Sequence, residues 1–170
     1  MDYFNHESER LTFRKLSESD IDSWLEFFEN NNTLHFLGMD PSREHRDLAT
    51  EWVQMQINRY AKNGLGHLAV VEKSTNTLIG FSGIILRELD GKTYYEIGYS
   101  FKPSSWGKGF ASEASKHLKT VGLATKISNK FVSIIHLANI ASMKVAEKNG
   151  MSRLFDTTFM NMEVAVFGDE

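Results

Sequence analysis

A glycine-rich loop between an expected strand and an expected helix is the segment of this sequence best suited to binding an anion. The loop and the helical residues after it are Gly107, Lys108, Gly109, Phe110, Ala111 and Ser112. Glycine permits turns and close backbone approaches that a Cβ would block. Several backbone N–H groups at a helix N-terminus attract a phosphate. The other interpretation of the same spacing is an ordinary strand–loop–helix junction with no ligand.

Two familiar nucleotide-binding loops do not fit this segment. A Walker loop needs Ser or Thr directly after Gly-Lys, but Gly109 follows Lys108, and no Gly lies five residues before Gly107. A dinucleotide fingerprint needs Gly or Ala at the position of Ser112 and an acid about 20 residues farther on. Residues 126–130 contain no acid. If this loop binds an anion, the anion therefore belongs to a ligand other than those bound by a Walker loop or a dinucleotide fingerprint.

Other common catalytic groups are absent or scattered. The chain has no Cys, which excludes disulfides, Cys-ligated zinc and a Cys nucleophile. The six His show no ligand spacing, so we expect no metal site. His67 and His136 lie on expected strands and are candidate bases, although a lone strand His is more often structural.

Length and composition restrict the class of protein. The chain has 170 residues, 41% hydrophobic and 24% charged, which predicts one globular domain over 1–170. The net charge of −3 and the pI of about 6.1 provide no basic field for nucleic acid. The polar N-terminus has no signal-like segment, and no apolar run approaches the ~20 residues of a membrane span. We expect a soluble, cytoplasmic protein.

Hydrophobic periodicity predicts the elements that position the loop. Expected strands cover residues 10–16, 67–73, 78–86, 92–101, 131–136 and 151–167, the last with a break near Asp156. Expected helices cover 21–28, 41–62, 111–126 and 140–148, with Asp40 as the N-cap of the second and Asn139 as that of the fourth. Asp90-Gly91 is a hairpin signal. The order predicts an α/β (α+β) protein with a mixed sheet covered by helices.

Two segments resemble a known family. The sequence Phe101-x-Pro103-x-x-Trp106-Gly-Lys-Gly-Phe-Ala111 resembles the acetyl-CoA-binding loop of the GNAT (GCN5-related) N-acetyltransferases, usually Gln/Arg-x-x-Gly-x-Gly/Ala. Gly109 and Ala111 match this pattern, while Trp106 stands in the Gln/Arg position.

The second match runs from Asn139 through Ser142 to Gly150 and resembles the family's later strand-to-helix segment. The opening Arg10-Leu-x-x-Arg14 and the Trp-Gly-Lys-Gly sequence resemble the subgroup that includes ribosomal-protein N-terminal acetyltransferases.

The resemblance implies a GNAT-like mixed, mostly antiparallel central sheet flanked by about four helices. It also implies acetyl-CoA as cosubstrate, no metal, and direct transfer to a primary amine of a protein N-terminus or a small molecule. Residues 107–112 would bind the pyrophosphate, and backbone groups of Tyr99 and Phe101 the pantetheine arm. Asn139 would hold that arm from the neighbouring strand, or serve only as a helix cap.

The resemblance further implies a general base at Glu96, although a strand carboxylate is also often solvent-facing or ion-paired. Many family members have a Tyr seven residues after the Asn to protonate the thiolate, but Ala146 occupies that position. Ser142 or a water molecule would then protonate the thiolate, with Ser142 also a candidate cofactor contact.

Residues 34–39, the second helix and 151–162 are expected to shape the acceptor side. We expect a monomer or homodimer with no nucleic-acid or membrane partner. A non-catalytic acyl-CoA sensor and an interaction module on the same fold are the alternatives to an enzyme.

Overall fold

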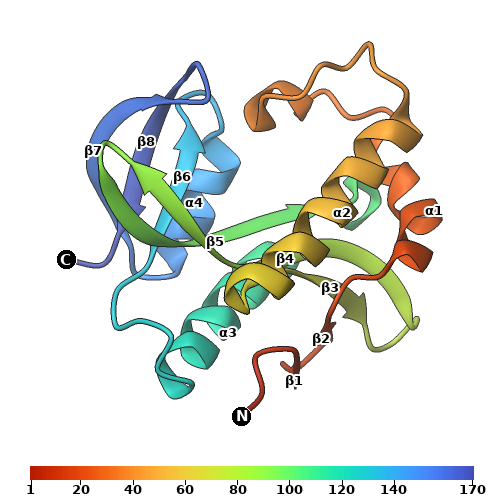
Figure 1. Cartoon of the computed structure of the whole chain (residues 1–170), viewed down its shortest axis with the longest axis horizontal. Coiled ribbons are helices and arrows are strands. Elements are labelled where there is room, and N and C mark those ends of the chain that lie inside the picture. The colour runs from red at the N-terminus through yellow and green to blue at the C-terminus, as the bar shows by residue number, and fades with distance from the viewer.

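The computed structural model describes all residues, 1–170, and is built on one eight-stranded sheet (Figure 1). The strand order is β1-β2-β3-β4-β5-β6-β8-β7, and only the β5–β6 pair is parallel. The strands are β1 Asn5–Glu7, β2 Leu11–Arg14, β3 Gly66–Glu72, β4 Thr77–Leu89, β5 Lys92–Phe101, β6 Val132–His136, β7 Ser152–Phe159 and β8 Met162–Gly168. This architecture confirms the expected mixed, mostly antiparallel sheet.

Four α-helices and four short 3₁₀ turns accompany the sheet. The α-helices are α1 Ile21–Trp24, α2 His45–Asn63, α3 Phe110–Ala124 and α4 Ile140–Lys148. The 3₁₀ turns are η1 Glu18–Asp20, η2 Leu25–Phe28, η3 Leu34–Leu37 and η4 Pro103–Ser105. None of the helices combines the length and the apolar composition that a bilayer crossing requires.

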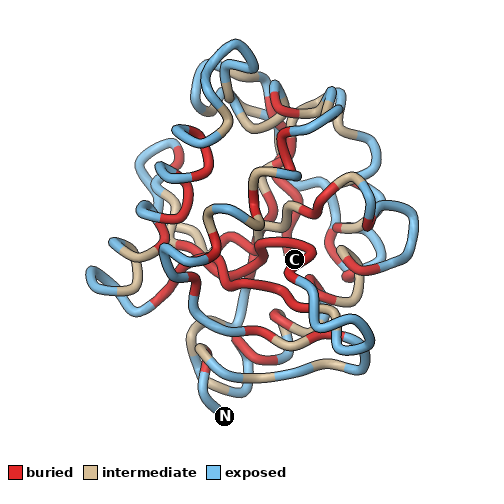
Figure 2. Tube along the Cα trace, turned by 90° about the vertical axis from the view of Figure 1, so that its right-hand side faces the viewer, coloured by how far each residue is buried: buried red, intermediate tan, exposed pale blue.

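The helices cover both faces of the sheet because the central strands are apolar on both faces. Along β3, Leu68 and Val70 belong to the core beneath α3 and α4, while Ala69 and Val71 belong to the core beneath α1 and α2. This alternation follows the two-residue period of a strand. Figure 2 shows the buried segments running through the interior of the molecule. The sheet therefore forms a rigid central layer on which a site can be built.

Strands β5 and β6 diverge after a single residue pair, Glu96 with Val132. On its other edge, β5 stays paired with β4 as far as Phe101. The β6-facing edge of residues 97–101 is therefore free of a partner strand, and two side chains bond to its carbonyls: the Ser133 hydroxyl donates to Ile97 at 2.8 Å and the Trp106 indole to Phe101 at 2.7 Å. This divergence opens the sheet beside the glycine-rich loop.

Local signals predicted most elements but not all boundaries. The Asp90-Gly91 turn and the Asn139 cap of α4 are both present. The prediction that α2 begins after Asp40 was wrong, because α2 begins at His45. Asp40 instead accepts hydrogen bonds from the backbone and hydroxyl of Ser42, as in an Asx turn.

The C-terminal strand pair and the N-terminal strand also differ from expectation. The break in the last strand lies at Met160 and Asn161, which adopt φ of 50° and 60°, rather than near Asp156. Strand β1 was not predicted, because three residues are too short for an alternating pattern to emerge.

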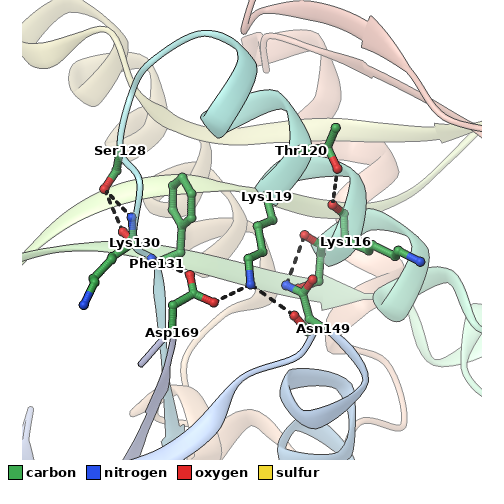
Figure 3. A network of polar contacts seen from close by, with 9 residues as sticks. Lys116, Lys119, Thr120, Ser128, Lys130, Phe131, Asn149 and Asp169 are labelled. Carbon is green, nitrogen blue, oxygen red and sulfur yellow. Dashed lines mark hydrogen bonds and ion pairs between the residues drawn. The ribbon is translucent and has the colours of Figure 1, made fainter.

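A polar network ties the end of α3 to the C-terminus (Figure 3). The Lys119 ammonium donates to the Asp169 carboxylate and, at 3.2 Å, to the Asn149 carbonyl. Asp169 also accepts from the backbone N–H of Phe131 at 3.0 Å. The Asn149 side chain donates to the Ser115 hydroxyl at 2.9 Å. These contacts hold α3 and α4 in a fixed relation, which fixes both walls of the site described below.

The Tyr3→Phe substitution is expected to lower the free energy of unfolding by about 1–3 kcal/mol. The buried Tyr3 hydroxyl donates to the Gly66 carbonyl at 2.7 Å and accepts from the Ile84 N–H at 2.7 Å. Removal of the hydroxyl leaves the Gly66 carbonyl and the Ile84 N–H buried without this hydrogen-bond partner. Urea unfolding measures the change, with Tyr94→Phe as control because the Tyr94 hydroxyl makes no hydrogen bond. Equal stability of the two variants would contradict this role of Tyr3.

Candidate active site

A cavity of about 630 Å³ lies beside the free edge of β5. Its walls come from the strand end, the glycine-rich loop, the start of α3 and the start of α4. Nine of the predicted site residues line it: Tyr99, Phe101, Gly107, Gly109, Phe110, Ala111, Ser112, Asn139 and Ser142. The structure thus brings together two sequence segments that lie about thirty residues apart. Lys108 and Glu96 do not line this cavity.

The loop takes its shape from two glycines in the left-handed backbone region. Gly107 has φ of 75°, and Gly109, the N-cap of α3, has φ of 80°. A side chain is strained in this conformation. A Cβ on Gly107 would meet no atom within 4 Å, and one on Gly109 would meet only Arg10 Nη2, at 3.5 Å. The space above the loop is therefore open, and the N-terminus of α3 faces a concavity that can accept an anion.

The N-terminal segment holds the loop in place. Arg10 Nη1 donates to the Lys108 carbonyl at 2.9 Å, and Arg10 Nε pairs with Glu113 Oε2 at 2.6 Å. Glu113 also accepts from the Ser8 hydroxyl at 2.7 Å. Hydrogen bonds from Arg10 and Ser8 lower the pKa of Glu113 against the opposing effect of burial. Lys108 thus contributes its carbonyl to the loop's support and lies outside the cavity lining.

Trp106 has a defined role in the loop, which the sequence alone did not explain. Its indole Nε1 donates to the carbonyl of Phe101, the last residue of β5, at 2.7 Å. The ring lines the cavity and is 44% exposed. The indole therefore fastens the loop to the strand end, and it also occupies one lone pair of the Phe101 carbonyl.

Three residues form the inner end of the cavity. The Asn139 side chain accepts a hydrogen bond from the Ser142 N–H at 3.2 Å, as a helix N-cap does. The Tyr99 hydroxyl donates to the Ser142 carbonyl at 2.8 Å. Burial raises the pKa of Tyr99 above its usual range. Ala146, in contrast, lies fully buried in the core and does not line this cavity.

A second cavity, of about 610 Å³, shares this inner end with the first. Both cavities are lined by Phe36, Leu37, Tyr99, Ser100, Asn139 and Ser142. The second cavity extends under α2, and residues 36–39 of the 34–39 segment also line it. Of residues 151–162, only Met160 lines it.

Glu96 lies in the second cavity and is held in an ion pair. Arg87 Nε donates to Glu96 Oε2 at 2.6 Å, and the residue is only 7% exposed. No protein group donates to Oε1. The carboxylate is thus oriented by one oxygen and has the other available to a ligand or water.

His67 lies in the same cavity as a neutral imidazole. Burial, followed by the charges of Arg59 and Arg87, lowers its pKa to about 3. An effective base has a pKa near the operating pH, so this imidazole is a poor proton acceptor. His136 also lines the cavity, but its Nδ1 accepts from the Ala138 N–H at 3.0 Å, which fits the structural role.

The sequence did not point to the polar residues that α2 contributes. Gln56 is 1% exposed, and its Oε1 accepts from the His67 N–H at 2.9 Å and from Arg59 Nη1 at 3.3 Å. One signal was present: Gln56 lies four residues after Trp52 and four before Tyr60, within the buried stripe of the helix. A polar residue in such a stripe indicates a buried polar site.

The arrangement provides two connected cavities, one beside a helix N-terminus and one containing an oriented carboxylate. No three His, Asp or Glu side chains gather as a group that could hold a metal ion. The chemistry available is therefore anion binding by backbone groups and proton transfer by a carboxylate.

Comparison with known proteins identifies a family. The model of the acetyltransferase (GNAT) domain matches residues 10–152. The chain is 29% identical over 133 residues to the uncharacterized protein YkkB of Bacillus subtilis (strain 168), covering 78% of this chain and 75% of that protein. It is 26% identical over 155 residues to the uncharacterized N-acetyltransferase p20 of Bacillus licheniformis, covering 88% and 85%.

Solved structures of the same fold include the ribosomal L7/L12 α-N-protein acetyltransferase RimL in complex with coenzyme A. It superimposes with a TM-score of 0.76 at 20% identity, over 95% of this chain and 94% of that chain. The family match, which spans most of the chain and both halves of the site, shows that this protein belongs to the GNAT acetyltransferases.

Proposed function

We propose that the protein transfers the acetyl group of acetyl-CoA to a primary amine, with the donor in the first cavity and the acceptor in the second. The observation that carries this proposal is the meeting of the two cavities at Tyr99, Asn139 and Ser142. A thioester in one cavity and an amine in the other would come into contact there. Holding two reactants in this way removes much of the entropic cost of a bimolecular reaction.

The donor's pyrophosphate would bind the backbone of residues 107–112. Two observations support this placement: the left-handed glycines leave open space, and the N-terminus of α3 carries partial positive charge. The pantetheine arm would lie along the free edge of β5 at Tyr99 and Phe101, with Asn139 on the opposite side. RimL, solved with coenzyme A, has the same fold.

Glu96 would act as the general base, through a water molecule if the acceptor is not in direct reach. The amine nitrogen attacks the thioester carbonyl, the new C–N bond forms, and the C–S bond breaks. The proton lost by the amine passes to Glu96. The ion pair with Arg87 supports this role because it orients the carboxylate and leaves Oε1 without a protein partner.

The departing thiolate would take a proton from water or from Ser142. Ala146 has no proton to give and lies in the core. Tyr99 lies at the junction, but its hydroxyl already donates to the Ser142 carbonyl at 2.8 Å, so it would have to give up this hydrogen bond before it could protonate the thiolate.

The Trp106→Phe substitution is expected to weaken coenzyme A binding about fivefold, because it removes one hydrogen bond that holds the loop. Isothermal titration with coenzyme A measures this change. The fold is expected to be unaffected, since Trp106 is a surface residue. Unchanged affinity would mean that the indole does not position the loop for the ligand.

An acceptor screen tests the proposed function. The purified protein is mixed with acetyl-CoA and a panel of amines, and free thiol is followed over time. Amine-dependent release is expected. Stabilisation by coenzyme A without turnover on any amine would favour the acyl-CoA sensor, and the absence of any thermal shift with coenzyme A would favour the interaction module.

A further inference from the structure

The second cavity contains a guanidinium without a carboxylate partner. Three arginines line this cavity. Arg43 pairs with Glu51 at 2.9 Å, and Arg87 pairs with Glu96 at 2.6 Å. Arg59, half-buried on α2, makes no ion pair, and its one side-chain hydrogen bond is the 3.3 Å contact with Gln56. A partly buried charge without a partner is unfavourable, so an anion is the missing component at this position.

His67, which lines the same cavity as Arg59, provides an independent sign of a ligand. The side chain is buried, and neither ring nitrogen has a hydrogen-bond partner. The ring lies against Gly98, where a Cβ would come within 2.6 Å of Nε2. A neutral imidazole has one donor and one acceptor, and leaving both unmatched costs free energy. Both residues line the same cavity, so a polar ligand bound at the guanidinium would lie beside the imidazole.

The charges around this position favour a negative group. Arg59 and Arg87 are the two nearby cations whose charges act on His67, and Glu96 is the one anion whose charge acts on Arg59. The lining as a whole is balanced, with three arginines and the three carboxylates Asp40, Glu51 and Glu96. Arg43 and Arg87 are matched by ion pairs, so the unmatched positive charge is local to Arg59, where it attracts an oxyanion and disfavours a second cation.

We propose that the acceptor is a small amine that also carries an oxyanionic group, a carboxylate or a phosphate, which Arg59 binds. This inference rests on the proposed function and names the substrate class of the same site. The planar guanidinium matches both oxyanions through two parallel hydrogen bonds. A cavity of about 610 Å³ is of the size that encloses a small molecule.

The same charges explain how such an acceptor would react. An acceptor with only an ammonium group would be repelled by Arg59, whereas an oxyanion offsets that repulsion and supplies the binding energy. With the oxyanion held by Arg59, the amine loses its proton to Glu96, and its lone pair becomes available for attack.

The test compares matched amines that differ only in the anion. Leucine is compared with leucinamide, and O-phosphoethanolamine with ethanolamine, at saturating acetyl-CoA. In each pair the first compound carries an oxyanion and is called the anionic amine, and the second lacks it and is called the neutral partner. A leucyl dipeptide amide represents a peptide N-terminus. At least one anionic amine is expected to react with a kcat/KM about 10- to 100-fold above that of its neutral partner. The two pairs distinguish carboxylate from phosphate. Preference for both neutral partners, or for the dipeptide amide, would overturn the proposal.

The leucine pair is biased against the proposal, which makes a positive result decisive. An amide next to an amine lowers the pKa of the ammonium group more than a carboxylate does. Leucinamide therefore has more free amine at neutral pH and reacts faster in the absence of any binding preference. Faster reaction of leucine must come from recognition of its carboxylate.

The variant Arg59→Gln tests whether this residue provides the recognition. The KM for the preferred anionic amine is expected to rise about 10- to 100-fold, while kcat/KM for its neutral partner falls by less than about threefold or rises, because the repulsion of its ammonium group by Arg59 is removed. Arg46→Gln is the matched control, because Arg46 lies on the same helix, pairs with Asp22 at 2.8 Å and lines neither cavity. An equal loss for the anionic and neutral amines in Arg59→Gln would overturn the assignment.

A binding measurement separates this inference from the proposed function. If no amine is acetylated, the thermal shift of the coenzyme A-saturated protein is measured with leucine, leucinamide, O-phosphoethanolamine and ethanolamine. Stabilisation by an anionic amine alone, lost in Arg59→Gln and kept in Arg46→Gln, supports the anion site although the transfer reaction has failed. No difference between anionic and neutral amines overturns the anion site, whether or not coenzyme A binds.

Discussion

Gly109→Leu is expected to weaken coenzyme A binding by at least about 100-fold. Gly109 is the N-cap of α3 and has φ of 80°, so its backbone lies where the pyrophosphate is proposed to bind. A leucine side chain would project into open space above the loop and exclude the phosphates from the backbone N–H groups. Hydrogen bonds to a charged group are each worth about 1.5–3 kcal/mol, and loss of two of them gives this effect. Isothermal titration with coenzyme A measures it.

Gly150→Leu is the matched control for this substitution. Gly150 has φ of 77°, a Cβ there would meet nothing within 4 Å, and the residue lines neither cavity. Both variants carry the same backbone strain of about 1–2 kcal/mol, so both should lose similar stability. Only Gly109→Leu should lose coenzyme A binding. Equal affinity of the two variants would show that the pyrophosphate does not bind at this loop.

Glu96→Gln is expected to lower kcat about 100- to 10,000-fold, the range for loss of a general base. The amide keeps the shape of the side chain but accepts a proton poorly. Affinity for coenzyme A should stay within about twofold, because Glu96 lines the other cavity. Steady-state kinetics measure the change in kcat, and isothermal titration measures the affinity for coenzyme A.

Two controls separate catalysis from structure at Glu96. The exposed Glu88 on β4 is the matched carboxylate, and Glu88→Gln should keep full activity. Because Glu96 is ion-paired with Arg87, the free energy of unfolding of Glu96→Gln must be measured as well. If a folded Glu96→Gln protein retained activity within about threefold, the base would be another group.

Local signals made much of the fold predictable. Asp90-Gly91 closes a hairpin, and Asn139 caps α4, because each depends on hydrogen bonds and backbone angles within a few residues. The same local chemistry was misleading at Asp40, where a cap-like Asp before a Pro closes a turn instead of starting α2. A turn and a helix start use the same hydrogen bond to the backbone, so the sequence did not distinguish them.

The cavity beside the glycine-rich loop was predictable from the sequence, whereas most of the second cavity was not. The loop at 107–112 and the segment at Asn139 are continuous motifs, and the structure brings them to one cavity. The residues His67, Arg59 and Glu96 lie on three different elements and form no motif. Strand register brings them together: His67 pairs with Gly83, and Gly83 pairs with Gly98. Neither glycine carries a side chain, which leaves room for the imidazole between strands that are far apart in sequence.

Transfer of a labelled acetyl group is the most direct measurement of the central claim. The protein is mixed with acetyl-CoA labelled in the acetyl group and with the amine that gives the fastest thiol release, and the products are separated by mass spectrometry. The account predicts that the label appears on the amine nitrogen in an amount equal to the coenzyme A released, and that Glu96→Gln slows both by about 100- to 10,000-fold. Release of coenzyme A with the label recovered as free acetate, or no release from a protein that binds acetyl-CoA, would contradict it.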